Sequence, residues 1–276
     1  MKGKYHVIVQ NRRVKFEFDI RRNITVVRGD SATGKTTLMT LIEAYERLGE
    51  DSGVTISCAC RCVTINNANW QAVLDSVSSC IVFADEDTKA IKTPEFARRI
   101  RQTNNYYVFI TRENLPNLPY SVEEIYGFHA SGKYSDLRKT YNSFYRIYEP
   151  AEPRADALVK TAIVEDSNSG YDFFLAIANK DVRVVSAGGK SNVRHLLFEV
   201  GSQDTLVIAD GAAFGSEMAD AMTRQEPVTC VRAGACLPRR TPGPRLPRRL
   251  VVGPLPFARL GIQVCHFQAV LAPGLL

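Results

Sequence analysis

The sequence predicts an α/β protein, a parallel sheet with an N-terminal β-hairpin followed by a smaller α/β domain. In the first 150 residues, short apolar and β-branched runs alternate with segments whose apolar residues recur every three or four positions. This alternation of strands and helices is typical of a parallel sheet covered by helices. A second alternation follows Pro150-Ala-Glu-Pro153, which resembles a linker. We therefore expect one domain over 1–150 and another over 154–232.

The first domain is expected to open with a hairpin, because the alternating segments 5–10 and 14–20 are separated by three residues. Leu38, Leu41, Ile42, Tyr45 and Leu48 have helical spacing, and this predicted helix ends at Gly49. The other predicted elements are strands at 23–28, 80–84 and 106–111, a strand pair within 54–65, helices around 70–77 and 96–102, and an aromatic-rich hairpin within 125–148.

The second domain repeats this pattern on a smaller scale, with length enough for a small parallel sheet. Its predicted elements are strands at 159–164, 182–185 and 205–209, helices at 171–178, 193–199 and 216–222, and a last strand at 228–231.

The composition is that of a globular protein, with 45% hydrophobic and 23% charged residues among 276. No apolar stretch reaches the roughly 18 residues that a membrane-spanning helix needs. The first residues also lack the apolar core of a secretory leader. We therefore expect a cytoplasmic protein with no membrane partner.

The net charge of +6 arises near the carboxyl terminus. From residue 227 onward there is no Asp, Glu or Lys, whereas seven of the 35 basic residues lie there, all Arg, leaving 28 basic and 29 acidic residues before it. The body therefore offers no sign of a basic binding face. The Pro- and Arg-rich tail, 233–276, is expected to be poorly ordered. It also resembles translation in a shifted reading frame, a hypothesis that the nucleotide sequence of the gene would test.

Three cysteines, Cys58, Cys60 and Cys62, alternate along a segment rich in β-branched residues. At a period of two they would share one face of a strand and pack there as small apolar side chains. Metal binding is the alternative, but this spacing lacks the second Cys or His pair of a zinc site.

The strongest motif is Gly29-Asp30-Ser31-Ala32-Thr33-Gly34-Lys35-Thr36, which matches G-x-x-x-x-G-K-[ST] and lies between a predicted strand and a predicted helix. Glycines let the backbone N–H groups surround a phosphate, and the N-terminus of the following helix adds positive potential. Lys35 would reach the β- and γ-phosphates, and the Thr36 hydroxyl would bind Mg²⁺. Thr37 completes the predicted binding segment. The alternative is a glycine-rich turn without a ligand, but a chain of this length gives only about 0.01 chance matches.

A pair of carboxylates, Asp85 and Glu86, follows the apolar run Cys80-Ile-Val-Phe-Ala. Asp85 is expected to support Mg²⁺, and Glu86 to act as the general base that activates water. A third strand end supplies Thr111 and Arg112, either of which would sense the γ-phosphate, although Arg112 could equally be a surface salt-bridge partner. Asn114 is a further candidate.

On these motifs, residues 1–148 resemble a P-loop NTPase of the additional-strand type, and the hairpin and the Asp-Glu pair resemble its ABC-like ATPase branch. The resemblance implies ATP and Mg²⁺ as ligands, with Lys35 and Glu86 as catalytic residues. The chain departs from ABC ATPases in two ways. It has no L-S-G-G-Q signature or helical insertion between Thr36 and Asp85, and Arg112 stands where that family usually has His.

The second domain resembles a Toprim domain, which has a Glu after its first strand and an Asp-x-Asp after a later one. Glu165 and Asp210 match, and the resemblance implies that they bind Mg²⁺ for phosphodiester chemistry. Position 212 is Ala, so the second Asp is missing. The alternative is a sheet whose strands simply end in acidic residues. A phosphate-loop ATPase followed by Toprim resembles a reduced member of the overcoming-lysogenisation-defect (OLD) family of ATPase-nucleases.

The leading hypothesis is an Mg²⁺-dependent ATPase whose nucleotide state regulates the second domain, in nucleic-acid processing or defence. A nucleotide-binding switch that hydrolyses little and acts through a partner is one alternative, and a small-molecule kinase is another. The kinase would need a lid of arginines, and Arg98, Arg99 and Arg101 form the only internal cluster. No N-K-x-D motif for guanine occurs, so adenine is expected. Nucleic acid, a protein partner or a second copy of the chain are the candidate partners beyond ATP.

Overall fold

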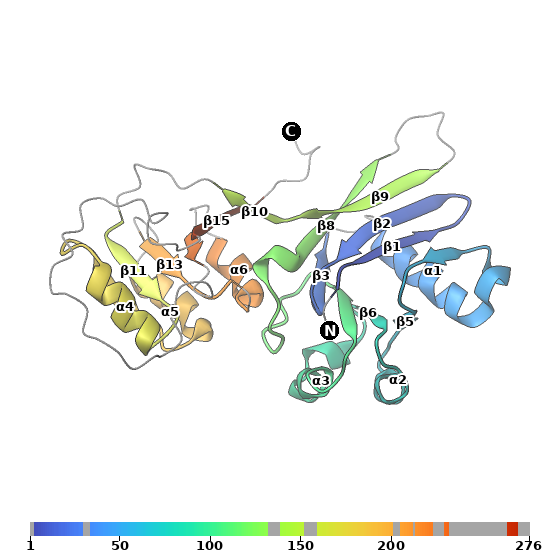
Figure 1. Cartoon of the computed structure of the whole chain (residues 1–276), viewed down its shortest axis with the longest axis horizontal. Coiled ribbons are helices and arrows are strands. Elements are labelled where there is room, and N and C mark those ends of the chain that lie inside the picture. The colour runs from blue at the N-terminus through green and yellow to red at the C-terminus, as the bar shows by residue number, and fades with distance from the viewer. Residues whose placement is uncertain are drawn as a thin grey trace. The chain divides into compact units, whose positions relative to one another are not determined.

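The computed structural model describes residues 3–29, 34–131, 139–151, 159–200, 205–211, 213–222, 229–231 and 264–269. It contains two compact units, one built on the described residues up to Ile147 and one on those from Tyr148 to Ala269 (Figure 1). The first holds a large, mostly parallel mixed sheet, and the second a small parallel sheet. The predicted α/β class is therefore confirmed, but the large sheet is mixed rather than purely parallel.

The first unit is built from strands β1 to β9 with helices between them. Their bounds are β1 Tyr5–Gln10, β2 Val14–Ile20, β3 Ile24–Arg28, α1 Lys35–Leu48, η1 Gly49–Ser52, β4 Thr55–Ser57, β5 Cys62–Thr64, α2 Trp70–Ser76, β6 Ile81–Asp85, η2 Lys89–Lys92, α3 Pro94–Ile100, β7 Tyr106–Ile110, η3 Val122–Glu124, β8 Ile125–Ser131 and β9 Thr140–Arg146.

The nine strands lie in the order β4-β1-β2-β9-β8-β3-β7-β6-β5. The predicted hairpin forms as β1 and β2, with Tyr5 opposite Ile20, and the predicted aromatic-rich hairpin forms as β8 and β9. The strands from β8 through β3, β7 and β6 to β5 are all parallel neighbours. The β2 strand joins this parallel block only through β9, to which it is parallel. Packing of distant strands thus extends the sheet well beyond its predicted core.

The predicted strand pair within 54–65 is wrong. Strands β4 and β5 form there, but β4 pairs with β1 and β5 pairs with β6, so they occupy the two ends of the strand order. Only four residues, 58–61, connect them. A connection this short requires the sheet to curve until its two edges lie near each other. The right-handed twist of strands permits such curvature.

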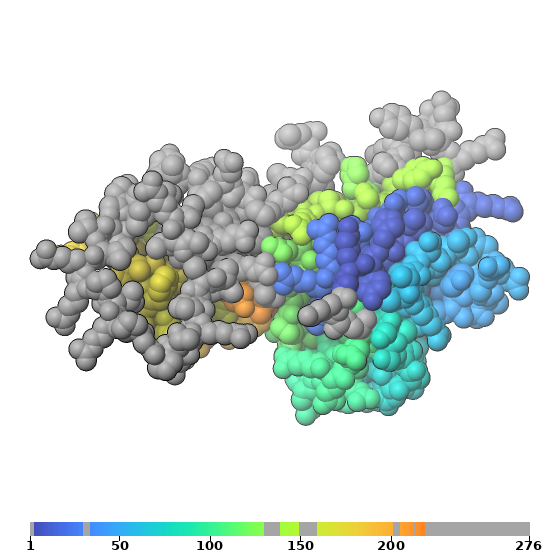
Figure 2. All heavy atoms as spheres, in the orientation of Figure 1, coloured from blue at the N-terminus to red at the C-terminus, as the bar shows by residue number. Residues whose placement is uncertain are grey.

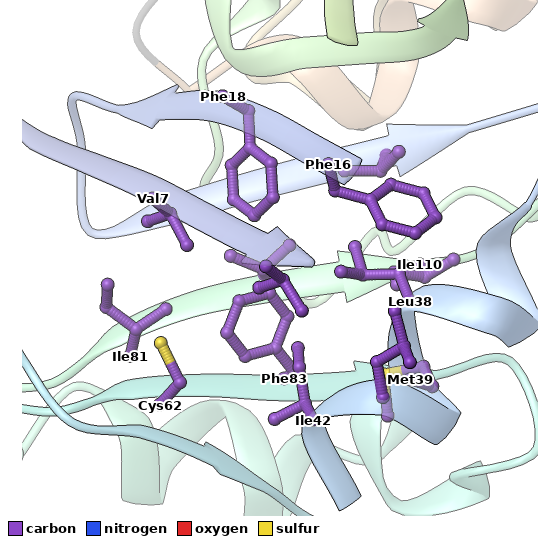
Figure 3. Close-up of a cluster of buried hydrophobic side chains, with 14 of the residues drawn as sticks. Val7, Phe16, Phe18, Leu38, Met39, Ile42, Cys62, Ile81, Phe83 and Ile110 are labelled. Atoms are coloured by element: carbon purple, nitrogen blue, oxygen red, sulfur yellow. The ribbon is translucent and has the colours of Figure 1, made fainter. Parts of the chain in front are cut away.

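Helix α1 packs against this curved sheet, and its apolar residues complete the main core. Leu38 and Ile42 are fully buried against side chains from β1, β2, β6 and β7, including Phe16 and Phe83 (Figure 3). This core explains why α1 forms where the helical spacing predicts it, since the spacing places these side chains on one face. In Figure 2 the β1–β2 hairpin, in dark blue, contributes to the surface of the first unit.

A second aromatic layer holds α2 and α3 against the parallel strands. The ring of Trp70 on α2 lies 5.4 Å from that of Phe96 on α3, and Phe96 lies 5.8 Å from Phe109 on β7, both edge to face. Helix α3 begins after Thr93, whose hydroxyl accepts a hydrogen bond from the N–H of Phe96 at 3.2 Å. This is an N-cap that satisfies a helix-end donor.

Replacing Phe83 by Ala should lower the free energy of unfolding of the first unit by about 3–5 kcal/mol, because it leaves a cavity in the core. Phe83 is 0% exposed and lies beneath α1. Trp70 is the only tryptophan in the chain, so its fluorescence during urea unfolding follows this unit alone. The control is Leu48→Ala, whose side chain is 50% exposed. Equal unfolding midpoints for the two variants would contradict this account of the core.

The second unit contains strands of two sheets and three helices among its described residues. Their bounds are β10 Tyr148–Ala151, β11 Thr161–Val164, α4 Ser169–Ile177, β12 Arg183–Ser186, α5 Lys190–Val200, β13 Thr205–Ile208, α6 Gly215–Met222, β14 Thr229–Val231 and β15 Val264–Ala269.

The parallel sheet of this unit has β11 at its centre, with β12 and β13 on either side. Ala162, Val164 and Phe174 belong to one buried cluster, which packs α4 on one face of the sheet. Ile163 and Val207 alternate to the opposite face and are also buried. The predicted strands and helices of the second domain are therefore confirmed, with small shifts in their bounds.

The predicted last strand forms as β14, but it lies outside the parallel sheet. It pairs antiparallel with β15, which in turn pairs with β10. Of the predicted tail, 233–276, the structure describes only 264–269, and these residues form β15. The rest of the tail lies outside the described residues. None of the helices in the described ranges is long and apolar enough to cross a membrane.

Candidate functional site

Three parallel strands of the first unit bring the predicted site residues together at the carboxyl-terminal ends of the strands. In the order β3-β7-β6, Val27 is in register with Ile110, and Ile110 with Asp85. The N–H of Thr111 donates to the carbonyl of Val27 at 3.0 Å, which continues the ladder to the end of the strands. The glycine-rich segment after β3, the carboxylates after β6 and Thr111–Arg112 after β7 therefore leave the sheet side by side.

Gly34 lies directly before α1, in a backbone conformation that favours glycine. Its φ is +91°, in the left-handed region, and a Cβ there would lie 3.4 Å from the ring of Phe16. The carbonyl of Gly34 accepts a hydrogen bond from the N–H of Leu38 at 3.0 Å, which starts the helix. Gly34, the N-cap of α1, has no side chain that could cap the helix, and the N-terminus of a helix attracts anions.

Only part of the predicted phosphate loop belongs to the described residues. The structure describes Gly29, Gly34 and Lys35, but not Asp30, Ser31, Ala32 and Thr33. Lys35 is 9% exposed, and its Nζ donates to the carbonyl of Gly29, across the segment between them. Lys35 therefore contacts Gly29, the first residue of the motif.

Thr36 and Thr37 occupy the first turn of α1, and both are exposed. The carbonyl of Thr36 is bonded within the helix by the hydroxyl of Thr40 at 2.9 Å. The position of Thr36 at the first turn suits the predicted hydroxyl ligand for Mg²⁺.

The two carboxylates at the end of β6 have different partners. Asp85 accepts a hydrogen bond from the hydroxyl of Thr88 at 3.2 Å, and Thr88 also bonds the carbonyl of Ile65. Glu86 lies 3.6 Å from Nη2 of Arg112, measured to Oε1, and the two side chains are 39% and 52% exposed. Arg112 therefore acts as a salt-bridge partner of the predicted general base. A role in sensing phosphate stays a prediction.

A second polar cluster, Arg28 with Asn114 and Tyr120, lies beside the loop. Nη2 of Arg28 donates to Oδ1 of Asn114 at 2.5 Å and to the hydroxyl of Tyr120 at 3.4 Å. The Nε of Arg28 is buried, and it has no hydrogen-bond partner among the residues that the structure describes. Because Arg28 directly precedes Gly29, this cluster holds the strand end from which the loop begins.

Two residues near the loop were not predicted from the sequence. Arg28 could have been noticed as a charged residue at the end of a buried strand. Asn142, on β9, is 6% exposed, and its Oδ1 lies 3.9 Å from the Cβ position of Gly34. Its only sequence signal is a buried amide in an aromatic-rich strand. Nothing local could place it beside a loop one hundred residues earlier, because that proximity depends on the pairing of β9 with β2.

The residues present suit a nucleotide phosphate with Mg²⁺. The carboxyl-terminal ends of these strands and the helix that follows supply one ammonium, the N-terminus of a helix, an exposed hydroxyl and two carboxylates, from Lys35, α1, Thr36, Asp85 and Glu86. Hard oxygen donors are the ligands that Mg²⁺ prefers, and it is usually held by one or two protein oxygens together with phosphates and water. Within the described ranges, no group of three or more His, Cys, Asp or Glu is arranged to hold a metal ion without such a ligand.

In the second unit, the structure brings Glu165 and Asp210 together. They follow β11 and β13, which are neighbours, and Oε2 of Glu165 accepts the N–H of Asp210 at 2.9 Å. Burial raises the pKa of the Glu165 carboxyl. The carboxylates of Asp210 and Glu217 raise this pKa further, whereas the N–H of Asp210 and the ammonium of Lys190 lower it.

Lys190 connects this acidic group to the start of α6. Its Nζ lies 3.5 Å from Oε1 of Glu217, and donates to the carbonyl of Ala213 and the hydroxyl of Ser216, both at 3.3 Å. Lys190 begins α5, after the turn at Gly188 and Gly189, whose φ values of +65° and +139° require glycine. Position 212 lies outside the described residues. The predicted ligands Glu165 and Asp210 thus meet, and their binding of Mg²⁺ stays a prediction.

The arginine cluster considered for a kinase lid does not lie at the phosphate edge. Arg98 and Arg99 are in the last turn of α3, and Arg101 is its C-cap. Because β7 begins shortly after them, all three lie toward the amino-terminal ends of the parallel strands. Arg99 forms an ion pair with Asp75 on α2, while Arg98 and Arg101 are exposed. Their position gives no support to a kinase lid.

The cysteines differ from the prediction. Only Cys62 lies in a strand, whereas Cys58 and Cys60 lie in the connection between β4 and β5. The expectation that all three share one face of a strand is therefore wrong. Backbone pairing of β4 and β5 with different partners prevents the continuous strand that the alternation predicts.

Comparison with known proteins leaves the chain without an assigned family. No protein-family model matches it, and no curated protein is similar to it at a significant level.

Proposed function

We propose that the first unit binds ATP with Mg²⁺ and hydrolyses it. The observation that carries this proposal is the register of β3, β7 and β6, which aligns the end of β3, followed in the sequence by Gly34 and Lys35, with Asp85 at the end of β6. The intervening strand β7 supports it too, because it brings Thr111 and Arg112 between these two strand ends. The N-terminus of α1 and the left-handed Gly34 add the features of a phosphate site.

The residues divide the work of hydrolysis among them. Lys35 and the first N–H groups of α1 would hold phosphate oxygens, and Thr36 and Asp85 would hold Mg²⁺. The bound ion would neutralise charge that develops on the phosphates. Glu86 would accept a proton from a water whose oxygen attacks the γ-phosphorus, while the bond from that phosphorus to the ADP oxygen breaks. Glu86 acts here as a general base, and the rest of the catalysis is positioning and charge stabilisation.

A nucleotide-binding switch with slow hydrolysis is the second candidate, and the ion pair between Glu86 and Arg112 favours it. The guanidinium of Arg112 lies 3.6 Å from this carboxylate, and the pair would have to separate before Glu86 could bind and activate a water. In this case bound ATP would persist and act through a partner or through the second unit.

The second unit is proposed to be a Toprim-like domain regulated by the nucleotide, as in a reduced OLD-type protein. The adjacent Glu165 and Asp210 at the ends of two parallel strands support this. Nucleic acid is the proposed substrate or partner, because carboxylates at such a place bind Mg²⁺ for phosphodiester chemistry.

Titration of ATP into the full chain with Mg²⁺ should give a calorimetric binding signal, and released phosphate should then accumulate. The ATPase hypothesis requires both results. Tight binding without turnover would instead identify a nucleotide-binding switch. Repeating the phosphate assay with DNA tests whether the proposed partner changes the rate. A chain that neither binds ATP nor releases phosphate would refute the proposal.

A further inference from the structure

Four free cysteines of the first unit lie around the connection between β4 and β5. Cys58 and Cys60 are half-buried, and Cys62 and Cys80 are buried, with Cys80 directly before β6. This cluster lies at the amino-terminal ends of β5 and β6, whereas the predicted phosphate loop follows the carboxyl-terminal end of the parallel strand β3. Figure 3 shows Cys62 beside Ile81, its partner in the ladder. Any chemistry of this cluster is therefore separate from the proposed nucleotide site.

Within the cluster, the sulfurs of Cys58 and Cys62 both contact the backbone of Cys60, the residue midway between them in the sequence. The Cys58 sulfur accepts a hydrogen bond from the N–H of Cys60 at 3.4 Å, and the Cys62 thiol donates to the carbonyl of Cys60 at 4.0 Å. The two thiols therefore lie near the same residue of the connection, a placement that suits the formation of a bond between them.

The electrostatics distinguish the two sulfurs. The neighbouring Cys62 side chain, the N–H groups of Cys60 and Ala59, and His6 on β1 lower the pKa of Cys58 to about 6, against the opposing effect of burial. The pKa of Cys62 is raised, first by the Cys58 side chain and then by burial. The other titratable groups that act on the thiols of the cluster are Cys60, Cys80, Arg61, Tyr5 and Tyr106. These shifts favour Cys58 as the thiolate and Cys62 as the thiol.

We propose that Cys58 is an oxidation site for hydroperoxides and that Cys62 resolves the oxidised sulfur into a disulfide. The thiolate of Cys58 attacks one peroxide oxygen, the O–O bond breaks, and the sulfur is oxidised to sulfenic acid while the peroxide is reduced to water or an alcohol. The sulfur of Cys62 then attacks the sulfenic sulfur, and the hydroxyl leaves as water with the proton of the Cys62 thiol. The balance is two thiols and one hydroperoxide giving one disulfide, one alcohol or water, and one further water.

Tryptic peptides of the peroxide-treated full chain test this directly, because Arg61 lies between the two cysteines. Trypsin separates residues 48–61, with Cys58 and Cys60, from residues 62–89, with Cys62 and Cys80. After treatment with hydrogen peroxide and blocking of remaining thiols, mass spectrometry should find the two peptides joined by a disulfide. The link should persist in a Cys60→Ser/Cys80→Ser variant and disappear in Cys58→Ser. Separate peptides in the treated wild type, or a link that survives Cys58→Ser, would overturn the proposal.

A second measurement does not depend on any variant. The rate at which iodoacetamide alkylates Cys58 should rise through a midpoint near pH 6 and level off above about pH 7, since the thiolate is the reactive form. In urea the midpoint should return to about 8.5, the value of an ordinary thiol. The same midpoint in folded and unfolded chain would show that the fold does not activate Cys58, and would refute the assignment of roles.

Discussion

Glu86→Gln should retain ATP binding and lose turnover by a factor of about 10²–10⁴, the usual contribution of a general base. Glutamine has nearly the same shape as glutamate but cannot accept the proton of the attacking water. The binding contacts proposed for Lys35 and Thr36 do not involve this side chain. Calorimetry with ATP and Mg²⁺, together with phosphate release, measures both quantities on one preparation.

The matched control is Glu95→Gln, the same exchange on α3, where the side chain is exposed and accepts a hydrogen bond from Gln71. Its turnover should equal that of the wild type. Glu86→Gln also removes the negative charge that pairs with Arg112, while a side chain of the same length remains. Unchanged phosphate release in Glu86→Gln would eliminate it as the base and leave the strand edge as a binding site.

Lys35→Ala should weaken ATP binding roughly ten- to hundredfold, as expected when a charge-assisted hydrogen bond worth about 1.5–3 kcal/mol is lost. Turnover should fall at least about 100-fold, since the ammonium also stabilises charge that develops on the phosphates. The control is Lys4→Ala, an exposed lysine that pairs with Asp19 at 2.8 Å, at the opposite edge of the sheet. Wild-type affinity and turnover in Lys35→Ala would mean that the loop holds no phosphate.

Because Lys35 is buried and bonds the carbonyl of Gly29, its replacement could also disturb the loop. Urea unfolding followed by the fluorescence of Trp70 separates the two effects. A variant that unfolds at the wild-type midpoint but binds ATP weakly has lost a ligand contact and not the fold.

Local residue patterns were enough to predict several parts of this molecule. The hairpin β1–β2, helix α1 and the small parallel sheet follow from periodicity, because burial of one face dictates the spacing of apolar residues. Gly34 was predicted for the same local reason, since a loop that wraps a phosphate needs the backbone freedom of glycine, and its φ is +91°. The proposed binding of ATP also depends on this sequence motif.

Pairing between distant strands was beyond such patterns. Strands β4 and β5 are close in the sequence, which predicts that they pair with each other, yet β4 pairs with β1 and β5 with β6. The backbone N–H and carbonyl groups of a strand bond to whichever strand the curved sheet places beside it. For the same reason β2 meets β9, which brings Asn142 next to Gly34.

The chemical environment of individual side chains was likewise decided by tertiary structure. The sequence is equally consistent with Arg112 as a phosphate sensor and as a surface salt-bridge partner, and the fold brings its guanidinium within 3.6 Å of Glu86. Cys58 and Cys62 are four positions apart, and the bend between β4 and β5 lets both sulfurs contact the backbone of Cys60. Sequence by itself determined which residues can do chemistry and which local elements carry them. Only the packing of elements far apart in the chain decided which of those residues meet, because through-space contacts set burial, charge and hydrogen bonding.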